Sequence, residues 1–346
     1  MVDGRLFMSL GERKPKVSVI VVNAKGTKQL EECLRALMET DYPNYDVTVV
    51  DCLTTGISEW MRERFPDVRL IHFDHDIGAS ASHNVEEKTL DPTVKYLSFL
   101  DNDAVVTKSW LRELVNVMES DEAIGMAQAK IILAKDRRIL DHAGIALDVL
   151  GTWYTTRGMR EDKLRKVFEI FAASSAACIV RREVFEEAGG FDPDYFIYDD
   201  DTDLSFRIRL LGYKVVFVPS AVVIHLGEQA KALSPRKLYH SVKNRTCTML
   251  KNYELRNLWW RFILYSVLTV MAALTLFAMG KRRESKEVFR GILYPIRNVR
   301  RIWEKRLRIQ AKRRLRDSEL LKRGLLRSDI YPTLLDLKSK LRYIKG

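Results

Sequence analysis

Short apolar runs alternate in the first part of the chain with segments whose apolar positions recur at helical spacing. Val17–Val22, Val47–Val50 and Tyr96–Leu100 are apolar runs of strand length. Between the first two runs, residues 30, 33, 34, 37 and 38 are apolar and their neighbours are largely charged, as on an amphipathic helix. Strands that alternate with helices predict an α/β fold with a mainly parallel, Rossmann-like sheet and helices on both of its faces.

Polar side chains stand where the predicted strands end. Asn23 follows the first strand, Asp51 follows the second, and Asp101 and Asp103 follow the run that ends at Leu100. In a parallel sheet, ligands bind beyond the carboxyl ends of the strands. We therefore expect these side chains to converge on one crevice.

A second group of carboxylates lies further along the chain. Asp200, Asp201 and Asp203 precede a helical pattern that ends at Gly212. Crowded carboxylates repel one another, and removing them from water costs free energy unless a cation or a proton compensates. The two groups together predict a divalent metal at one and proton abstraction at the other, which is the chemistry of a sugar-nucleotide transferase. The pattern between residues 125 and 160 is looser, which suits a region that covers the site and meets an acceptor.

Residues 262–280 carry no formal charge and are bordered by Trp259, Trp260 and the basic residues 281–283. This length and these borders are typical of a bilayer-embedded helix, and the alternative is a buried core helix. A single crossing would export the basic end of the chain, against the positive-inside tendency. We therefore expect this segment to enter the bilayer or to lie in its plane, with the tail on the cytoplasmic leaflet.

The positive charge is concentrated near the C-terminus. The whole chain has a formal net charge of +12, and residues 281–346 contain about 22 Lys and Arg against about 7 Asp and Glu. Such a tail favours an anionic partner, and its apolar positions predict basic amphipathic helices on an anionic membrane surface. Nucleic acid is the alternative partner, but the adjoining apolar segment favours lipid, so no nucleic acid is expected.

The chain divides into four predicted segments. Residues 1–15 are an N-terminal extension, 16–255 an α/β domain, 256–280 an apolar membrane-associated helix and 281–346 a basic amphipathic helical tail. The 4 cysteines form no C-x-x-C pair, and the N-terminus has no long apolar run of a secretory signal. We therefore expect the α/β domain on the cytoplasmic side of the cell membrane.

Six short motifs occur in one order along residues 15–255. They are Val17–Asn23, Val49–Asp51, Asp101–Asp103, Gly189–Asp192, Asp200–Leu204 and His225. Each is weak by itself, but in this order they resemble family 2 glycosyltransferases, and within them the rhamnosyltransferase-like, membrane-associated branch. The resemblance implies a GT-A fold, an inverting mechanism, a nucleoside-diphosphate sugar donor and Mg²⁺ or Mn²⁺.

For the donor, the resemblance implies roles for residues near the strand ends. Asp51 would accept hydrogen bonds from the donor base, and Asp101 would contact the ribose or a metal-bound water. Gly78 and Asn84 belong to a segment similar to a donor-binding segment of the family, and Asn23 would also face the donor. The alternatives are a loop cap at Asp51 and a simple turn at Gly78.

The resemblance also implies a metal site. Asp101 and Asp103 are two residues apart, so alternation along a strand directs both side chains to the same side. Asp103 would bind the metal, and His225 would complete the ligands or contact the diphosphate. The alternatives are a solvated loop at the aspartates and a structural role for His225.

By the same resemblance, Asp201 is the base that takes the proton from the acceptor hydroxyl. Asp200 fills the preceding acidic position on the acceptor side. Asp203 and Arg207 are also placed there, and their spacing of four residues allows an ion pair on a helix. Crowding should raise the pKa of one of the clustered carboxyls. The alternative is an acidic cap on the surface.

The sequence thus predicts an inverting, metal-assisted glycosyltransferase that acts on a lipid-linked or surface-glycan acceptor. One alternative is a polyprenyl-phosphate sugar synthase of the same fold. Another is a non-catalytic membrane scaffold with a basic tail. A nicotinamide enzyme is disfavoured because no G-x-G-x-x-G follows the first strand.

Overall fold

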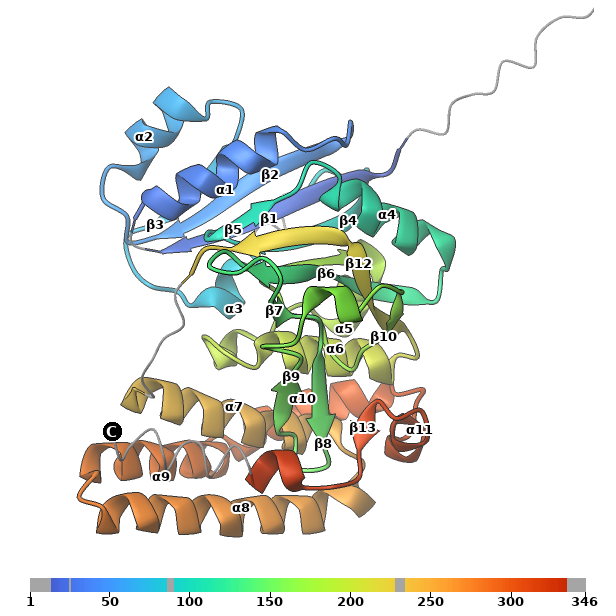
Figure 1. The fold of residues 1–346 in the computed structure, drawn as a ribbon. Helices are drawn as coiled ribbons and strands as arrows, with labels where there is room; N and C mark the ends of the chain where they lie inside the picture. The colour runs from blue at the N-terminus through green and yellow to red at the C-terminus, as the bar shows by residue number, and fades with distance from the viewer. Residues whose placement is uncertain (1–13, 25, 86–89, 228–233, 335–346) are drawn as a thin grey trace, which may run out of the picture.

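The computed structural model describes residues 14–24, 26–85, 90–227 and 234–334 (Figure 1). Its main sheet has the strand order β10-β12-β6-β11-β4-β1-β2-β3, with β5 paired to β12 and β7 paired to β6. The strands are β1 Lys16–Ala24, β2 Tyr45–Cys52, β3 Arg69–Phe73, β4 Val94–Asp101, β5 Ala104–Val106, β6 Ile124–Leu133, β7 Leu140–His142, β10 Phe168–Glu169, β11 Ala177–Arg181 and β12 Lys214–His225. The predicted N-terminal extension, residues 1–15, lies outside the described residues apart from its last two positions.

The sheet is mainly parallel, as predicted. β3, β2, β1 and β4 run parallel to one another, β11 is antiparallel to β4 and β6, and β12 is parallel to β6. The register pairs Asn23 with Asp51 and Val22 with Asp101. The carboxyl ends of β1, β2 and β4 therefore meet at one edge of the sheet, with their polar residues side by side.

Helices cover both faces of the sheet, which confirms the predicted layering. One core cluster joins Val19 and Val49 of the sheet to Leu34 of α1, and the other joins Ile20 and Phe99 to Phe185 of α5. The covering helices are α1 Lys28–Met38, α2 Ile57–Arg64 and α4 Trp110–Ser120 on one face, and α5 Arg182–Ala188 and α6 Asp200–Leu210 on the other (Figure 1). A short helix, α3 Ala79–Ser82, lies between β3 and β4 in the chain.

The segment with the loose pattern begins with a central strand rather than a cover. β6 lies between β11 and β12 and is buried along most of its length. The sequence pattern does not predict a buried central strand here because Gln128 and Lys130 interrupt the apolar run. Gln128 is buried but accepts a hydrogen bond from Ser174 N at 2.7 Å, so its burial leaves the side-chain oxygen satisfied.

Among the described residues, five helices follow the last strand of the main sheet. They are α7 Pro235–Asn252, α8 Leu255–Ala278, α9 Arg282–Arg297, α10 Val299–Ala311 and α11 Asp317–Lys322. α7 lies between the α/β part and the pair α8 and α9 (Figure 1). The chain then returns and adds β13 Leu326–Arg327 to a small sheet with β8 Ile145–Asp148 and β9 Trp153–Thr155, so the predicted helical tail also contains a strand.

Two faces of α8 differ in exposure. In the described part of the chain, α8 is the one helix long and apolar enough to cross a membrane. Its buried face includes Leu258, Arg261, Tyr265, Thr269, Ala273 and Leu276. Its exposed apolar side chains are Leu255, Trp259, Ile263, Val267, Met271, Leu274 and Phe277. The helix therefore lies along the protein with an uncovered apolar strip, and it is not a core helix.

Candidate active site

Amide and carboxylate side chains tie the ends of β1, β2 and β4 together. Asn102 donates through Nδ2 to Asn23 Oδ1, and Asn23 donates through Nδ2 to Asp51 Oδ1. Asp51 is buried, accepts hydrogen bonds from Thr54 N and Oγ1, and lies 2.8 Å from His72 Nδ1. Asn23, rather than Asp51, lines the neighbouring cavity. The contact between Asp51 and a donor base stays a prediction, and in this arrangement Asp51 reaches the cavity only through Asn23.

Asp101, Asp103 and His225 come together where β4 and β12 end. His225 Nε2 lies 3.1 Å from Asp103 Oδ2. Hydrogen bonding to Asp103, and then to Asp141, raises the pKa of His225 to about 10. Burial, followed by the charges of Asp103 and Asp200, raises the pKa of Asp101 to about 7. The charge of Asp200 in the second acidic group therefore affects the pKa of Asp101 in the first, although the two residues lie far apart in the chain.

Asp141 is a buried residue of the site that the sequence reasoning missed. Its Oδ2 lies 2.6 Å from His225 Nδ1, and its Oδ1 lies 2.7 Å from Arg157 Nη2. Because Nδ1 of His225 is engaged in this way, Nε2 is the nitrogen that faces Asp103. Asp141 lies 84 residues from His225 in the chain, and no spacing in the sequence points to the pair.

The second acidic group forms the first turn of α6. Asp201 Oδ2 accepts a hydrogen bond from Ser175 N at 3.4 Å, and its Oδ1 accepts one from Thr202 N at 2.6 Å. The next residue after Ser175 is Ala176, whose carbonyl oxygen accepts a hydrogen bond from Asp101 N at 3.2 Å. The turn at residues 174–176 therefore contacts both acidic groups and brings Asp101 and Asp201 to the same region.

The environment of Asp201 suits a proton acceptor. Burial, with the charges of Asp200 and Asp199, raises the pKa of Asp201 to about 8. Burial also raises the pKa of Asp200, which lies 3.9 Å from His83. A carboxyl group whose pKa is near the working pH can take up and release a proton efficiently. This side chain can therefore serve as a general base for a hydroxyl group that approaches α6.

A cavity of about 280 Å³ opens at Asn23, and neither acidic group is among the residues that line it. Its walls come from the ends of β1 and β2, from α3, from residues 196–198 and from the start of α7. Gly78 lines it with φ of +82°, and a Cβ atom there would meet Phe196 O at 2.6 Å. Gly78 therefore allows the close approach of Phe196, and its contact with the donor stays a prediction. Arg236 also lines the cavity and stacks on the Phe196 ring, 5.0 Å from its centre.

Two side chains of the site can act as metal ligands. The described residues contain no group of three or more His, Cys, Asp or Glu that could hold a metal ion. Asp103 and His225 offer one carboxylate and one imidazole, already oriented toward each other. Carboxylate suits Mg²⁺ and Mn²⁺, imidazole suits transition metals, and such ions commonly take their remaining ligands from phosphates and water. The pair therefore fits a metal that is shared with a bound diphosphate.

Asn84, predicted to contact the donor, is engaged elsewhere. Its Nδ2 donates to Phe191 O at 2.7 Å, and its Oδ1 accepts from Phe191 N at 2.9 Å. Both ends of the amide hold the turn at residues 190–191. In this structure Asn84 supports the loop before α6 and is not among the residues that line the cavity, so its contact with the donor stays a prediction.

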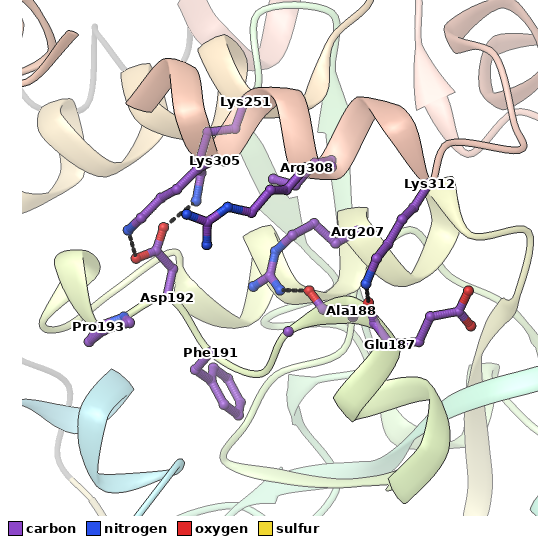
Figure 2. A pocket seen from close by; sticks show the side chains of 12 residues that line it. Glu187, Ala188, Phe191, Asp192, Pro193, Arg207, Lys251, Lys305, Arg308 and Lys312 are labelled. Carbon is purple, nitrogen blue, oxygen red and sulfur yellow. Dashed lines mark hydrogen bonds and ion pairs between the residues drawn. The ribbon is translucent and has the colours of Figure 1, made fainter. Parts of the chain in front are cut away.

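Asp203 and Arg207 form an ion pair, as their spacing allowed. Asp203 is buried, and its Oδ2 lies 2.9 Å from Arg207 Nε and 3.0 Å from Lys251 Nζ. Lys251 also binds Asp192, which Lys305 of α10 contacts in turn (Figure 2). These residues join α6 to α7 and α10. The pair therefore connects helices, and its place on the acceptor side stays a prediction.

The fold has solved counterparts among sugar-nucleotide enzymes. GalNAc-T7, solved with UDP, GalNAc and Mn²⁺, superposes with a TM-score of 0.58 at 18% identity, over 82% of this chain and 58% of its own. The mannosyltransferase PcManGT of Pyrobaculum calidifontis, solved with GDP-Man and Mn²⁺, superposes with a TM-score of 0.52 at 18% identity, over 87% and 86%. At these identities the likeness shows the GT-A fold, as predicted.

Curated relatives are similar in sequence. The O-antigen biosynthesis protein RfbC of Myxococcus xanthus is 30% identical over 224 residues, which are 61% of this chain but only 17% of RfbC. The N-acetylglucosaminyl-diphospho-decaprenol L-rhamnosyltransferase of Mycobacterium tuberculosis is 25% identical over 274 residues, 70% of this chain and 86% of that enzyme. The family model described as "Glycosyltransferase like family 2" matches residues 15–249. The chain therefore belongs to this family and is a glycosyltransferase.

Proposed function

We propose that the chain transfers rhamnose from a nucleoside-diphosphate donor to a lipid-linked glycan acceptor, with inversion at the anomeric carbon. The observation that carries this proposal is Asp201, a carboxyl group with a raised pKa that shares its region with Asp101 and Asp103. The names of two relatives support the sugar: the mycobacterial enzyme above and the dTDP-rhamnosyl transferase RfbF of Shigella flexneri, which is 21% identical over 258 residues.

The reaction follows from this arrangement as a single displacement. The acceptor hydroxyl oxygen attacks the anomeric carbon while its proton passes to the carboxylate of Asp201. The bond between the anomeric carbon and the diphosphate oxygen breaks, and the nucleoside diphosphate leaves with that electron pair. Because attack comes from the face opposite the leaving group, the configuration inverts. The proton on Asp201 then returns to water before the next turnover.

The donor binds, in this proposal, in the cavity beside β1, β2 and α3. Asn23 lines that cavity and Asp51 fixes the Asn23 amide. Asp103 and His225 would hold Mg²⁺ or Mn²⁺, which stabilises the negative charge on the departing diphosphate. Asp141 fixes the ring of His225 so that Nε2 is presented. The pKa of Asp101 responds to the charges of both proposed metal ligands and of Asp200, the residue before the proposed base.

The acceptor is proposed to reach the site from a membrane surface on the cytoplasmic side. α8 exposes an apolar strip with Trp259 near its start, and basic residues such as Arg282 and Arg283 follow its end. A helix with this composition lies in the interface of an anionic bilayer. The α/β part stands above α7, α8 and α9 (Figure 1). An enzyme held in this way meets an acceptor whose lipid end stays in the bilayer.

Asp201→Asn tests the proposal. The amide keeps the shape of the side chain but cannot take up a proton, so transfer should fall by about 100-fold or more while donor binding stays close to wild type. Transfer from dTDP-rhamnose to a lipid-linked N-acetylglucosamine acceptor and calorimetric donor binding measure the two effects, with UDP- and GDP-sugars as comparison donors. Asp136→Asn serves as the control, since Asp136 is a half-buried residue of the loop between β6 and β7 and belongs to neither acidic group.

Three results would contradict the proposal. Wild-type turnover in Asp201→Asn would remove Asp201 from the role of base. Transfer to a polyprenyl phosphate that survives the substitution would favour the alternative enzyme, since a phosphate nucleophile needs little help from a base. Absence of nucleotide-sugar binding in the wild-type chain would favour the scaffold.

A further inference from the structure

The chain that enters α6 has an unusual backbone conformation. Phe196, Tyr198 and Asp199 have φ values of 67°, 67° and 59°, a region that side chains other than glycine rarely adopt. At Phe196, φ of 67° and ψ of −57° make a γ-turn, closed by a hydrogen bond from Ile197 N to Tyr195 O at 2.8 Å. A γ-turn of this hand is rare and strained, so surrounding contacts must hold it.

The contacts that hold the turn come from Asn244 of α7, whose side chain is completely buried. Its Nδ2 donates to three carbonyl oxygens of the turn, those of Tyr195 at 3.2 Å, Ile197 at 2.9 Å and Tyr198 at 2.7 Å. An amide turned the other way would set its oxygen against the same three carbonyls, which fixes its orientation. One buried donor group therefore holds most of the turn.

Lys243, the residue before Asn244, also donates hydrogen bonds to this segment. Its Nζ donates to Tyr195 O at 3.3 Å and also to Asp194 O, just upstream of the turn. The opposite side of α7 packs against α9, where Val242 contacts Gly291. The side chains that hold the turn are thus carried by a helix that is itself held between the α/β part and the C-terminal helices.

The turn joins two parts of the site. After it, the carbonyl oxygen of Asp199 accepts a hydrogen bond from Asp203 N at 3.0 Å and starts the helical turn that carries Asp201. Before that point, residues 196–198 form a wall of the cavity proposed for the donor. Phe196 O also accepts a hydrogen bond from Ser80 N at 3.3 Å, and the same oxygen is the atom that approaches Gly78. A displacement of the turn would move the base and the cavity wall together.

We infer that Asn244 is a positioning residue for the transfer reaction. Its amide holds the left-handed turn and so sets where Asp201 stands relative to a donor in the cavity. The inference rests on the proposed function, because it takes Asp201 as the base. Asn244 touches no reacting group itself and acts only through the backbone of residues 195–199.

Asn244→Asp is the sharpest test because it keeps the shape of the side chain and replaces the two donor hydrogens by an acceptor. We expect kcat to fall by about 100-fold, as for a displacement of a catalytic group by about 1 Å, with little change in the KM for the acceptor. Asn244→Ala is the second variant if the first does not fold. Lys243→Met removes the contacts to Asp194 O and Tyr195 O but leaves those of Asn244 to the turn, so it should lower kcat less.

Asn252→Ala is the matched control. Asn252 lies on the same helix and is equally buried, but its Nδ2 donates to Asp203 at 2.8 Å instead of to the turn. It should lower the unfolding temperature as the Asn244 variants do and leave kcat close to wild type. Amide hydrogen exchange at residues 195–199 provides a readout that is independent of turnover: exchange should quicken in the Asn244 variants and not in Asn252→Ala.

The outcomes separate this inference from the proposed function. Folded Asn244→Ala with wild-type kcat and wild-type exchange at residues 195–199 would overturn the inference. Equal losses of kcat in Asn244→Ala and Asn252→Ala would reduce Asn244 to a general stabilising residue and also overturn it. If the wild-type chain transfers no sugar, the proposed function fails, while the exchange measurement still decides whether Asn244 holds the turn.

Discussion

The exposed strip of α8 gives the most direct test of how the protein meets a membrane. Seven large apolar side chains there keep between 51% and 64% of their surface accessible. Replacing Ile263 and Met271 together by aspartate places two charges on the strip without touching the buried face of the helix. We expect this double variant to fold as the wild type does and to lose most of its affinity for anionic vesicles.

The size of the effect follows from the exposed areas. Burying a whole Ile or Met side chain contributes about 1.5–3 kcal/mol. Ile263 and Met271 are 55% and 59% exposed, so insertion of each contributes about 1 kcal/mol. Losing both contributions removes about 2 kcal/mol, which is about a 30-fold weaker partition into the bilayer. Desolvation of the two carboxylates adds to this loss, so the figure is a lower bound.

Sedimentation with vesicles of phosphatidylcholine and phosphatidylglycerol measures the partition. High salt screens the attraction between the basic tail and the anionic lipid and leaves the apolar contribution of α8. Met159→Asp with Val167→Asp is the matched control, since both side chains are exposed and lie outside α8 to α10. The reasoning is refuted if the Ile263 and Met271 double variant sediments as the wild type does, or if the control loses as much binding.

Two further predictions concern the buried charges. Because Asp201 must be ionised to accept a proton and its pKa is about 8, kcat should rise with pH up to about that value. In Asp200→Asn the rise should move to lower pH, since a neighbouring negative charge is gone; an unmoved profile would contradict the assignment. Asp203→Ala leaves the buried cation Lys251 with one carboxylate fewer, so chemical denaturation should show a loss of about 3–5 kcal/mol in unfolding free energy; an unchanged midpoint and slope would contradict the ion-pair network.

The sequence by itself determined the layered α/β part. A strand covered on both faces must be apolar at nearly every position, so Val17–Val22 and Tyr96–Leu100 identify β1 and β4 without knowledge of their neighbours. Parallel strands end at a common edge, and this rule already places Asn23 beside Asp51. The order of short motifs identified the family. The length of segment 262–280 and its lack of formal charges identified α8 as a distinct helix.

Local patterns failed where a polar side chain depends on a distant partner. The segment that contains β6 looked irregular because the side-chain oxygen of the buried Gln128 is paired with Ser174 N, a distant group that no local pattern includes. Asn84 resembles a donor ligand in sequence, yet both ends of its amide hold Phe191, 107 residues away. Asp203 sits in an acidic run, yet its partners on α7 decide that it joins helices.

Only the tertiary structure determined which carboxyl groups have raised pKa values. The pKa values of Asp101 and Asp201 rise because packing removes water from them and brings other charges near. Neither effect can be predicted from the spacing of these residues in the sequence. The contact between Asp141 and His225 and the contact between Asn244 and the turn before α6 likewise cannot be predicted from residue spacing. Hydrophobic periodicity is a property of neighbouring residues, so it can be read from the chain. Burial, pairing and strain are properties of segments brought together by folding, so they appear only in the folded molecule.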